Sequence, residues 1–174
     1  LLRATHRVLR HLPPPAPAEG RSDTALGDWY VNRLVVGRRP LLLLVSSASL
    51  LAMLHPARDV RSLPDRLANL VSERLLRLGM PGSIAAAEAS VMAPVITART
   101  ADRSVLGSLN DFAHTLPYHL SASGWRDSEL VSVEAVLAGT PCRVTGRSAD
   151  VIFPGRCALA LLSARWGGLS ADGA

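Results

Sequence analysis

The run from Leu41 to Leu54 constrains the fold more than any other segment, because only serines interrupt its apolar residues. It is fourteen residues long, whereas a helix that spans a membrane needs about 20. An apolar run of this length is typical of a protein core, so we expect no contact with a membrane. Periodicity alone does not separate buried strands from a buried helix in so short a run.

The residues around this run favour strands. Residues 29–36 have the pattern of a strand, residues 37–39 supply a turn that contains glycine, and Pro40 opens a second strand through Val45. Two such strands joined by a short turn form an antiparallel hairpin. We expect a third strand over residues 50–55, and a buried helix over 41–54 is the alternative.

Helical spacing of leucine and valine predicts a helix over residues 63–78, in which an apolar stripe indicates packing rather than chemistry. Ser62 and Asp65 stand at the positions of an N-terminal capping box, and Gly79 suits a left-handed stop. Residues 1–12 suit either a helix or a short strand followed by a helical turn. The other expected elements are a helix from Ser83 to before Pro94, a strand over 95–98, a helix that Pro117 ends, a helix over 128–137, short strands within 143–153 and a helix over 157–166.

Early strands followed by helices indicate an α+β fold, with a small antiparallel, hairpin-based sheet packed against several short helices. The length of 174 residues suits one domain, which we place at residues 1–166. Four prolines within residues 13–17 predict a loop over 13–24, because proline lacks the backbone donor that helices and central strands require. We expect the tail, residues 167–174, to be disordered.

The net charge of +5 comes from 19 basic residues, all of them arginine. We attribute the lack of lysine to a GC-rich genome, since no physical requirement excludes lysine from a surface. A basic domain is attracted to nucleic acid, but the arginines are scattered, and only Arg38 and Arg39 are adjacent. Nucleic-acid binding is therefore an alternative and not the leading hypothesis.

Cys142 and Cys157 lie fifteen residues apart and lack the spacing of metal ligands. We interpret them as two reduced thiols of a cytosolic protein, and we expect neither a metal nor a cofactor. The sequence also lacks the GxGxxG, Walker, HExxH and GxSxG signatures, which disfavours the common nucleotide-binding, zinc-protease and serine-hydrolase classes.

The densest polar segment, residues 100–114, predicts the start and outer face of a helix. Arg103 lies at its entrance, and Asn110 and His114 lie one turn apart on the face opposite the apolar stripe. Backbone N–H groups at a helix start attract anions, and Arg103 reinforces that attraction. The structural alternative, which we favour, is that Asp102 or Ser104 only caps the helix and that Asn110 holds a loop.

A second polar cluster precedes the first long strand. Gly27 permits a tight turn, and Asp28 is placed to accept backbone N–H bonds. Trp29 and Tyr30 point to opposite faces of a strand, so we expect one to be buried and the other exposed. Asp28 and Asp111 would form an acid–base or metal-binding pair if the fold brought them together, although capping or solvated roles are the simpler interpretation.

Two motifs carry a resemblance to a known family. LGDWYVNRLVVGRRPLLLLV, followed by RTADRSVLGSLNDFA, resembles the uncharacterised bacterial family named domain of unknown function 6933. The resemblance spans roughly residues 1–140, a length that suits one domain. The family has no assigned activity, so the resemblance implies no mechanism.

The leading hypothesis is a cytosolic binding or accessory module of unknown activity, which acts on a protein partner or as part of a fused protein. The candidate binding residues are those of the two polar clusters: Asp28, Trp29, Arg103, Asn110, Asp111 and His114. A third hypothesis is a phosphate-handling hydrolase with Arg103 as the anion clamp and Asp111 or Asp28 as the base. It requires these groups to converge in one cleft.

Overall fold

The apolar run forms two strands of a sheet in the computed structural model, which describes residues 1–17, 22–143 and 151–170. Strand β2 (Trp29–Val36) and strand β3 (Arg39–Ser46) pair as an antiparallel hairpin, with Trp29 opposite Ser46. Strand β4 (Ala52–Pro56) pairs antiparallel with the other side of β3. The predicted strands are confirmed, and the alternative of a buried helix is wrong.

The third strand begins two residues later than predicted because residues 46–51 close into a tight turn. The hydroxyl groups of Ser46 and Ser49 lie 2.6 Å apart in the interior of this turn. The N–H of Leu50 donates to the carbonyl of Ser46, and Leu50 has a φ of 58°. A left-handed residue does not continue a strand, so β4 starts at Ala52.

The sheet is mixed, which corrects the expectation that it is wholly antiparallel. Strand β1 (Leu2–Ala4) lies between β2 and strand β5 (Thr97–Arg99) and runs parallel to both, so the order is β4-β3-β2-β1-β5. Helix α1 (His6–Leu9) follows β1 directly, which confirms the strand-then-turn option for the N-terminal segment. The α+β class itself is confirmed.

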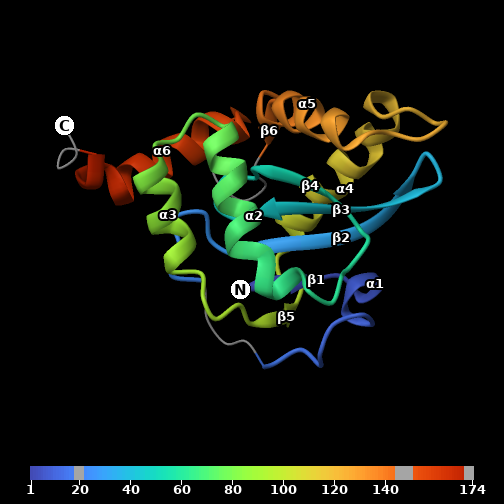
Figure 1. The fold of residues 1–174 in the computed structure, drawn as a ribbon, viewed down its shortest axis with the longest axis horizontal. Helices are drawn as coiled ribbons and strands as arrows, with labels where there is room; N and C mark the ends of the chain where they lie inside the picture. Colours follow the sequence, from blue (N-terminus) through green and yellow to red (C-terminus); the bar gives the residue numbers. More distant parts are fainter. Residues whose placement is uncertain (18–21, 144–150, 171–174) are drawn as a thin grey trace.

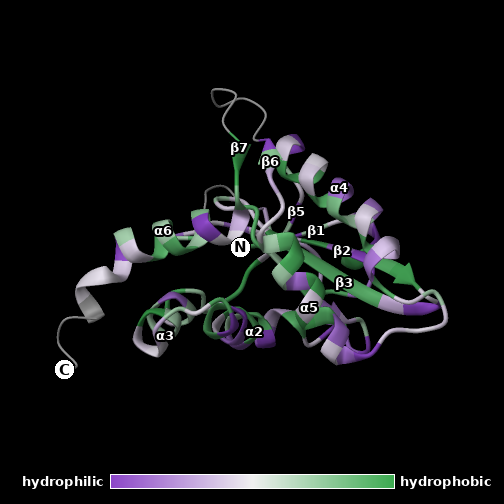
Figure 2. Cartoon of the chain, turned by 90° about the horizontal axis from the view of Figure 1, so that it is seen from above, coloured by the Kyte–Doolittle hydropathy of each residue, from purple (hydrophilic) through white to green (hydrophobic). Residues whose placement is uncertain are grey.

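Helices cover both faces of this sheet. Helices α2 (Leu63–Arg77), α3 (Gly82–Ser90) and α6 (Pro154–Trp166) pack on one face, and helices α4 (Arg103–His119) and α5 (Asp127–Ala138) pack on the other. Side chains alternate along β3, so that Leu42 and Leu44 join the first core while Leu41 and Leu43 join the second. Figure 1 shows α2 in front of the sheet and α4 behind it, and Figure 2 shows the same separation from above. Strand β3 is therefore buried on both faces, which explains its continuous apolar run.

Three helix ends test the predicted stop and start signals. Gly79 has a φ of 93°, which confirms the left-handed stop after α2. The cap at Ser62 is wrong: Ser62 has nearly helical backbone angles, and its hydroxyl donates to the carbonyl of Asp59. Helix α4 runs past Pro117 to His119, because a proline in the last turn removes a single N–H bond and the N–H of Leu120 still donates to Leu116.

The C-terminal part contains a second, small sheet. Strands β6 (Cys142–Arg143) and β7 (Val151–Ile152) pair antiparallel, in agreement with the short strands predicted there, and residues 144–150 lie outside the described residues. Residues 13–17 form a loop, as expected, and residues 18–21 of the predicted loop are not described. A 3₁₀-helix, η1 (Gly167–Ser170), occupies the first half of the expected disordered tail, and residues 171–174 are not described. Within the described ranges, no helix combines the length and apolarity needed to cross a membrane.

Candidate functional site

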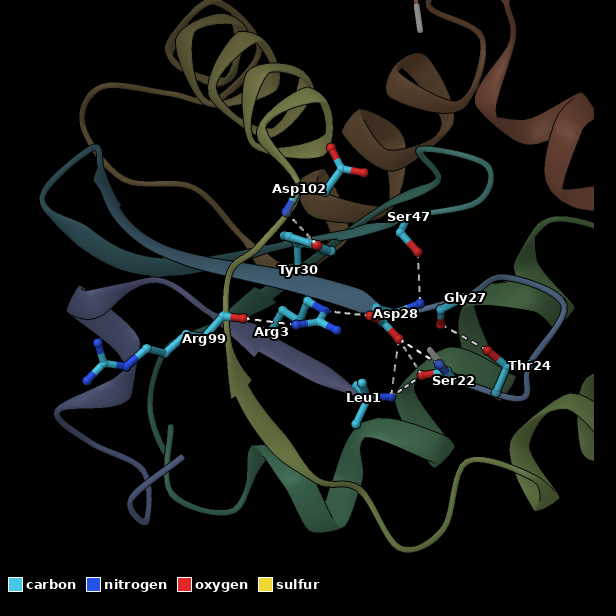
Figure 3. Close-up of polar contacts among 10 residues, drawn as sticks. All are labelled: Leu1, Arg3, Ser22, Thr24, Gly27, Asp28, Tyr30, Ser47, Arg99 and Asp102. Atoms are coloured by element: carbon cyan, nitrogen blue, oxygen red, sulfur yellow. Dashed lines mark hydrogen bonds and ion pairs between the residues drawn. The ribbon is translucent and has the colours of Figure 1, made fainter. Parts of the chain in front are cut away.

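Asp28 is the centre of a buried polar network at the start of β2. The guanidinium of Arg3 donates to one carboxylate oxygen at 2.5 Å, and the backbone N–H and hydroxyl of Ser22 donate to the other at 2.9 and 2.7 Å (Figure 3). Arg3 also donates to the carbonyl of Arg99 in β5. Burial by itself raises the pKa of Asp28, but the hydrogen bonds from Arg3 and Ser22 outweigh it and hold the pKa below its usual value. Asp28 thus joins β1, β2 and the preceding loop as a charged, fully engaged carboxylate.

The turn before Asp28 has the conformation that the sequence predicts. Gly27 has a φ of 71°, and a Cβ there would collide with the hydroxyl of Ser47, which accepts the N–H of Asp28. Ser22 supplies the backbone N–H bond that we expected Asp28 to accept.

Trp29 and Tyr30 are both buried, so the prediction that one of them is exposed is wrong. Trp29 packs on the face covered by α2, and Tyr30 packs on the face covered by α4. Helices on both faces cover the first residues of β2, so that neither face is open to solvent there. The hydroxyl of Tyr30 accepts the N–H of Asp102 at 3.1 Å and so connects β2 to the start of α4 (Figure 3).

Helix α4 presents the other four candidate residues to solvent. Asp102 caps the helix by accepting the N–H groups of Ser104 and Val105, as the structural alternative proposed. Arg103, Asn110, Asp111 and His114 are all exposed on the outer face. Among the described residues, no hydrogen bond or ion pair joins any of these four to Asp28 or Trp29.

This placement argues against the phosphate-handling hypothesis. Arg103 and Asp111 are eight positions apart on α4, a rise of about 12 Å. The oxygens of Asp28 are occupied by Arg3 and Ser22. An anion clamp and a base must reach one reacting group, and these residues do not converge in that way.

The two adjacent arginines that supported nucleic-acid binding, Arg38 and Arg39, differ in their contacts. The guanidinium of Arg39 stacks over the ring of Trp125 at 4.2 Å, donates to the carbonyl of Trp125 and lies 3.9 Å from Asp127. Arg38 is exposed in the hairpin turn. One of the two charges is thus neutralised within the fold.

A buried ion pair that the sequence analysis did not identify lies at the β4 edge of the sheet. Arg74 of α2 is 2% exposed and Glu134 of α5 is 1% exposed, and they approach to 3.4 Å. Glu134 accepts the N–H of Leu54 at 2.8 Å, and Arg74 donates to the carbonyl of Ala52 at 3.1 Å. Burial lowers the pKa of Arg74, an effect that the charge of Glu134 opposes. The pair therefore satisfies two backbone groups of edge strand β4, the N–H of Leu54 and the carbonyl of Ala52.

Above this pair, β4 lies between α2 and α5 (Figure 1), and the three elements line a cleft of about 430 Å³. Arg77 donates to Glu134 at 3.1 Å and lies 3.9 Å from Glu73. The lining residues include both apolar and charged side chains: Met53, Leu54, His55, Pro56, Arg58, Arg66, Leu70, Glu73, Arg77, Asp127, Leu130, Val131 and Glu134.

The outer end of the cleft carries a histidine between arginines. Arg66 and the Nε2 of His55 lie 2.9 Å apart, and Arg58 lies 3.7 Å from Asp127. Burial is the larger cause, and the charge of Arg66 the next, that lowers the pKa of His55 below its usual value. A neutral His55 accepts a hydrogen bond from Arg66 and places no positive charge of its own beside the guanidinium.

The family model described as Domain of unknown function (DUF6933) matches residues 1–157. The chain belongs to the DUF6933 family. No curated protein matches it. The resemblance drawn from the two motifs is thus confirmed, and the match extends beyond the 140 residues that we expected.

All three regions described above are part of the DUF6933 match. It contains the network around Asp28, the outer face of α4 and all three elements of the cleft, and it ends inside α6. Among the described residues, no three histidine, cysteine, aspartate or glutamate side chains gather closely enough to hold a metal ion. No disulfide joins Cys142 to Cys157.

A sequence signal for the cleft did exist in this DUF6933 chain. Arg74 stands four residues after Leu70 and three after Val71, inside the apolar stripe of α2, and Glu134 stands four residues after Leu130. Two opposite charges on two buried helix faces predict a buried ion pair, because an unpaired charge there would be strongly destabilising. Which strand they meet could not be predicted without the fold.

Proposed function

We propose that this DUF6933 protein is a cytosolic bacterial binding module that holds a small molecule in the cleft between α2, β4 and α5. The observation that carries the proposal is the cleft itself, whose volume of about 430 Å³ lies in the range of ligand sites, 300–1,000 Å³. Leu70, Leu130 and Val131 give it apolar walls, and charged groups stand at both ends. Apolar walls with a few convergent polar groups are the usual composition of a ligand site.

The polar groups favour binding rather than catalysis. Glu134, the most buried carboxylate of the cleft, has one oxygen on the N–H of Leu54 and the other on Arg77 and Arg74. A carboxylate engaged in this way shapes a site but is poorly placed to take a proton from a ligand. The lack of a disulfide between Cys142 and Cys157 supports the cytosolic part of the proposal, and the lysine-free composition supports the bacterial part.

Filling the cleft tests the proposal. Val131 lines it and is 45% exposed, whereas Val136 is 48% exposed on the same helix and does not line it. Val131→Trp should therefore block the cleft, and Val136→Trp is the matched control. Each protein is incubated with a filtered small-molecule extract of bacterial cytosol, desalted and examined by native mass spectrometry. We expect the wild type and Val136→Trp to retain a ligand that Val131→Trp loses; no retention by the wild type, or equal retention by Val131→Trp, would refute the proposal.

A further inference from the structure

The two ends of the α2–β4–α5 cleft differ in charge. At the inner end, Arg74 and Arg77 face Glu134 and Glu73, so two cations balance two anions. At the outer end, Arg39, Arg58 and Arg66 accompany the carboxylates of Asp127 and Asp59. Asp127 lies 3.9 Å from Arg39 and 3.7 Å from Arg58, and the exposed Asp59 interacts electrostatically with Arg66. Three positive charges thus face two carboxylates, which leaves an excess of one positive charge at the outer end.

Arg66 is the residue best placed to use this excess. Its side chain is exposed and lines the cleft, and its hydrogen-bonded partner is His55 at 2.9 Å. A guanidinium has five N–H donors in a rigid fork that matches the two oxygens of a phosphate or carboxylate. The contact with His55 uses one of these donors and leaves others for a ligand in the cleft that Arg66 lines.

The residues beside Arg66 indicate that the ligand also has an apolar part. Leu70 follows Arg66 by one turn of α2, and Leu130 and Val131 stand opposite on α5. An anion held at Arg66 would therefore have apolar surface beside it. A small inorganic ion would leave most of the cleft of about 430 Å³ empty.

Resting on the proposed binding function, we infer that the ligand is a small amphiphilic anion, whose phosphate or carboxylate group binds Arg66 and Arg58 at the outer end and whose apolar body lies against Leu70, Leu130 and Val131. The oxyanion supplies affinity through charge-assisted hydrogen bonds, and the body supplies it through burial of apolar surface. Binding should weaken as salt rises, because the two arginines are exposed to solvent.

Four probes that share a phenyl ring test the inference: phenyl phosphate, benzoate, benzyl alcohol and benzylamine, with inorganic phosphate as a fifth. Dissociation constants are measured by calorimetry, and the site is located by amide chemical shifts. We expect phenyl phosphate or benzoate to bind at least tenfold more tightly than benzyl alcohol, benzylamine and inorganic phosphate, with shifts in α2, β4 and α5. The preference between the first two identifies the oxyanion.

Arg66→Gln should weaken binding of the preferred anion by tenfold or more. Arg61→Gln removes the same charge from an exposed residue that does not line the cleft, and it should change the affinity less than twofold. Equal losses in the two variants, or no preference for anions, would overturn the inference. A neutral or cationic ligand that Val131→Trp displaces would overturn it and leave the proposed function standing, whereas a cleft that takes neither the probes nor an extract ligand would overturn both.

Discussion

Asp28 and Arg3 form an ion pair in which both side chains are nearly enclosed, with exposed fractions of 7% and 10%. Removing one partner of such a pair leaves a buried charge without its counter-charge, which destabilises a protein by about 3–5 kcal/mol. We therefore expect Asp28→Ala to lower the free energy of unfolding in urea by about that amount.

The double variant Arg3→Met/Asp28→Leu is the control for this pair, because replacing both charges with apolar groups is often nearly neutral. It should be more stable than Asp28→Ala alone. A single variant that unfolds at the wild-type urea concentration would contradict the network described around β2.

His55 gives the stability a defined dependence on pH. Its pKa in the folded protein is lowered from 6.5, first by burial and then by Arg66. Arg58 adds to this effect, and Asp127 and Glu73 oppose it. The unfolded chain therefore binds a proton at His55 more readily than the folded protein, so stability rises with pH through this window.

The His55 contribution is complete above pH 6.5 and is lost as pH falls below 6.5 toward the pKa of the folded state. We expect the free energy of unfolding of the wild type to fall more steeply over this range than that of His55→Gln. Denaturant titrations at several pH values measure the difference. Parallel curves for the two proteins would contradict a lowered pKa at His55.

At the scale of elements, the edge strand β4 depends on side chains from two helices. Glu134→Gln removes a charge with little change in size and leaves the guanidinium of Arg74, which is 2% exposed, without its buried counter-charge. We expect the variant to lose about 3–5 kcal/mol of unfolding free energy. Urea denaturation measures this loss.

Glu73→Gln provides the contrast within the same cleft. The Glu73 carboxylate is 64% exposed and lies 3.9 Å from Arg77 at the i,i+4 spacing, and such pairs contribute about 0.2–0.5 kcal/mol. Similar losses in Glu73→Gln and Glu134→Gln would show that the buried position of Glu134 does not determine its contribution.

Elements with strong periodicity could be predicted from the sequence, and the pairing of distant strands could not. The β2–β3 hairpin follows from a short turn between apolar strands, and the buried stripe of α4 follows from Val105, Leu109, Phe112 and Leu116. Strand β1 is three residues long and pairs in parallel with β2 and β5. Nothing local to residues 2–4 specifies partners so far along the chain, and a parallel pair has no connecting turn to indicate it.

The candidate site could be predicted only in part for the same reason. Two predictions depended only on nearby residues: that Asp28 accepts a backbone N–H, and that Asp102 or Ser104 caps α4. In the structure Ser22 donates its N–H to Asp28, and Asp102 caps α4. The cleft requires three elements that are separated by many residues, β4, α2 and α5. In the sequence, its charged residues have the pattern of an ordinary solvent-exposed helix surface. Only the fold shows that the edge strand β4 lies between the two helices.

For the whole molecule, helix α6 contributes core residues that lie beyond the end of the family match. The DUF6933 match ends at residue 157, but Ala158 and Leu162 of α6 are completely buried in the core on the α2 face. Near the end of α6, the indole N–H of Trp166 donates to Glu88 at 2.8 Å. Glu88 is 1% exposed and also accepts the N–H groups of Ala25 and Leu26. The helix thus stabilises the loop that leads into β2.

A chain that ends at residue 157 should therefore be markedly less stable than the full chain. Burial of Leu162 contributes about 1.5–3 kcal/mol, and a hydrogen bond to a charged group contributes about 1.5–3 kcal/mol, so we expect a loss of at least about 3 kcal/mol in urea denaturation. Leu162→Ala in the full chain should reproduce a loss of about 2–5 kcal/mol. Ser163→Ala, at an exposed position of the same helix, should change the stability by less than about 0.5 kcal/mol. If the shortened chain unfolds at the same urea concentration as the full chain, residues 158–174 do not stabilise the core, and this prediction is wrong.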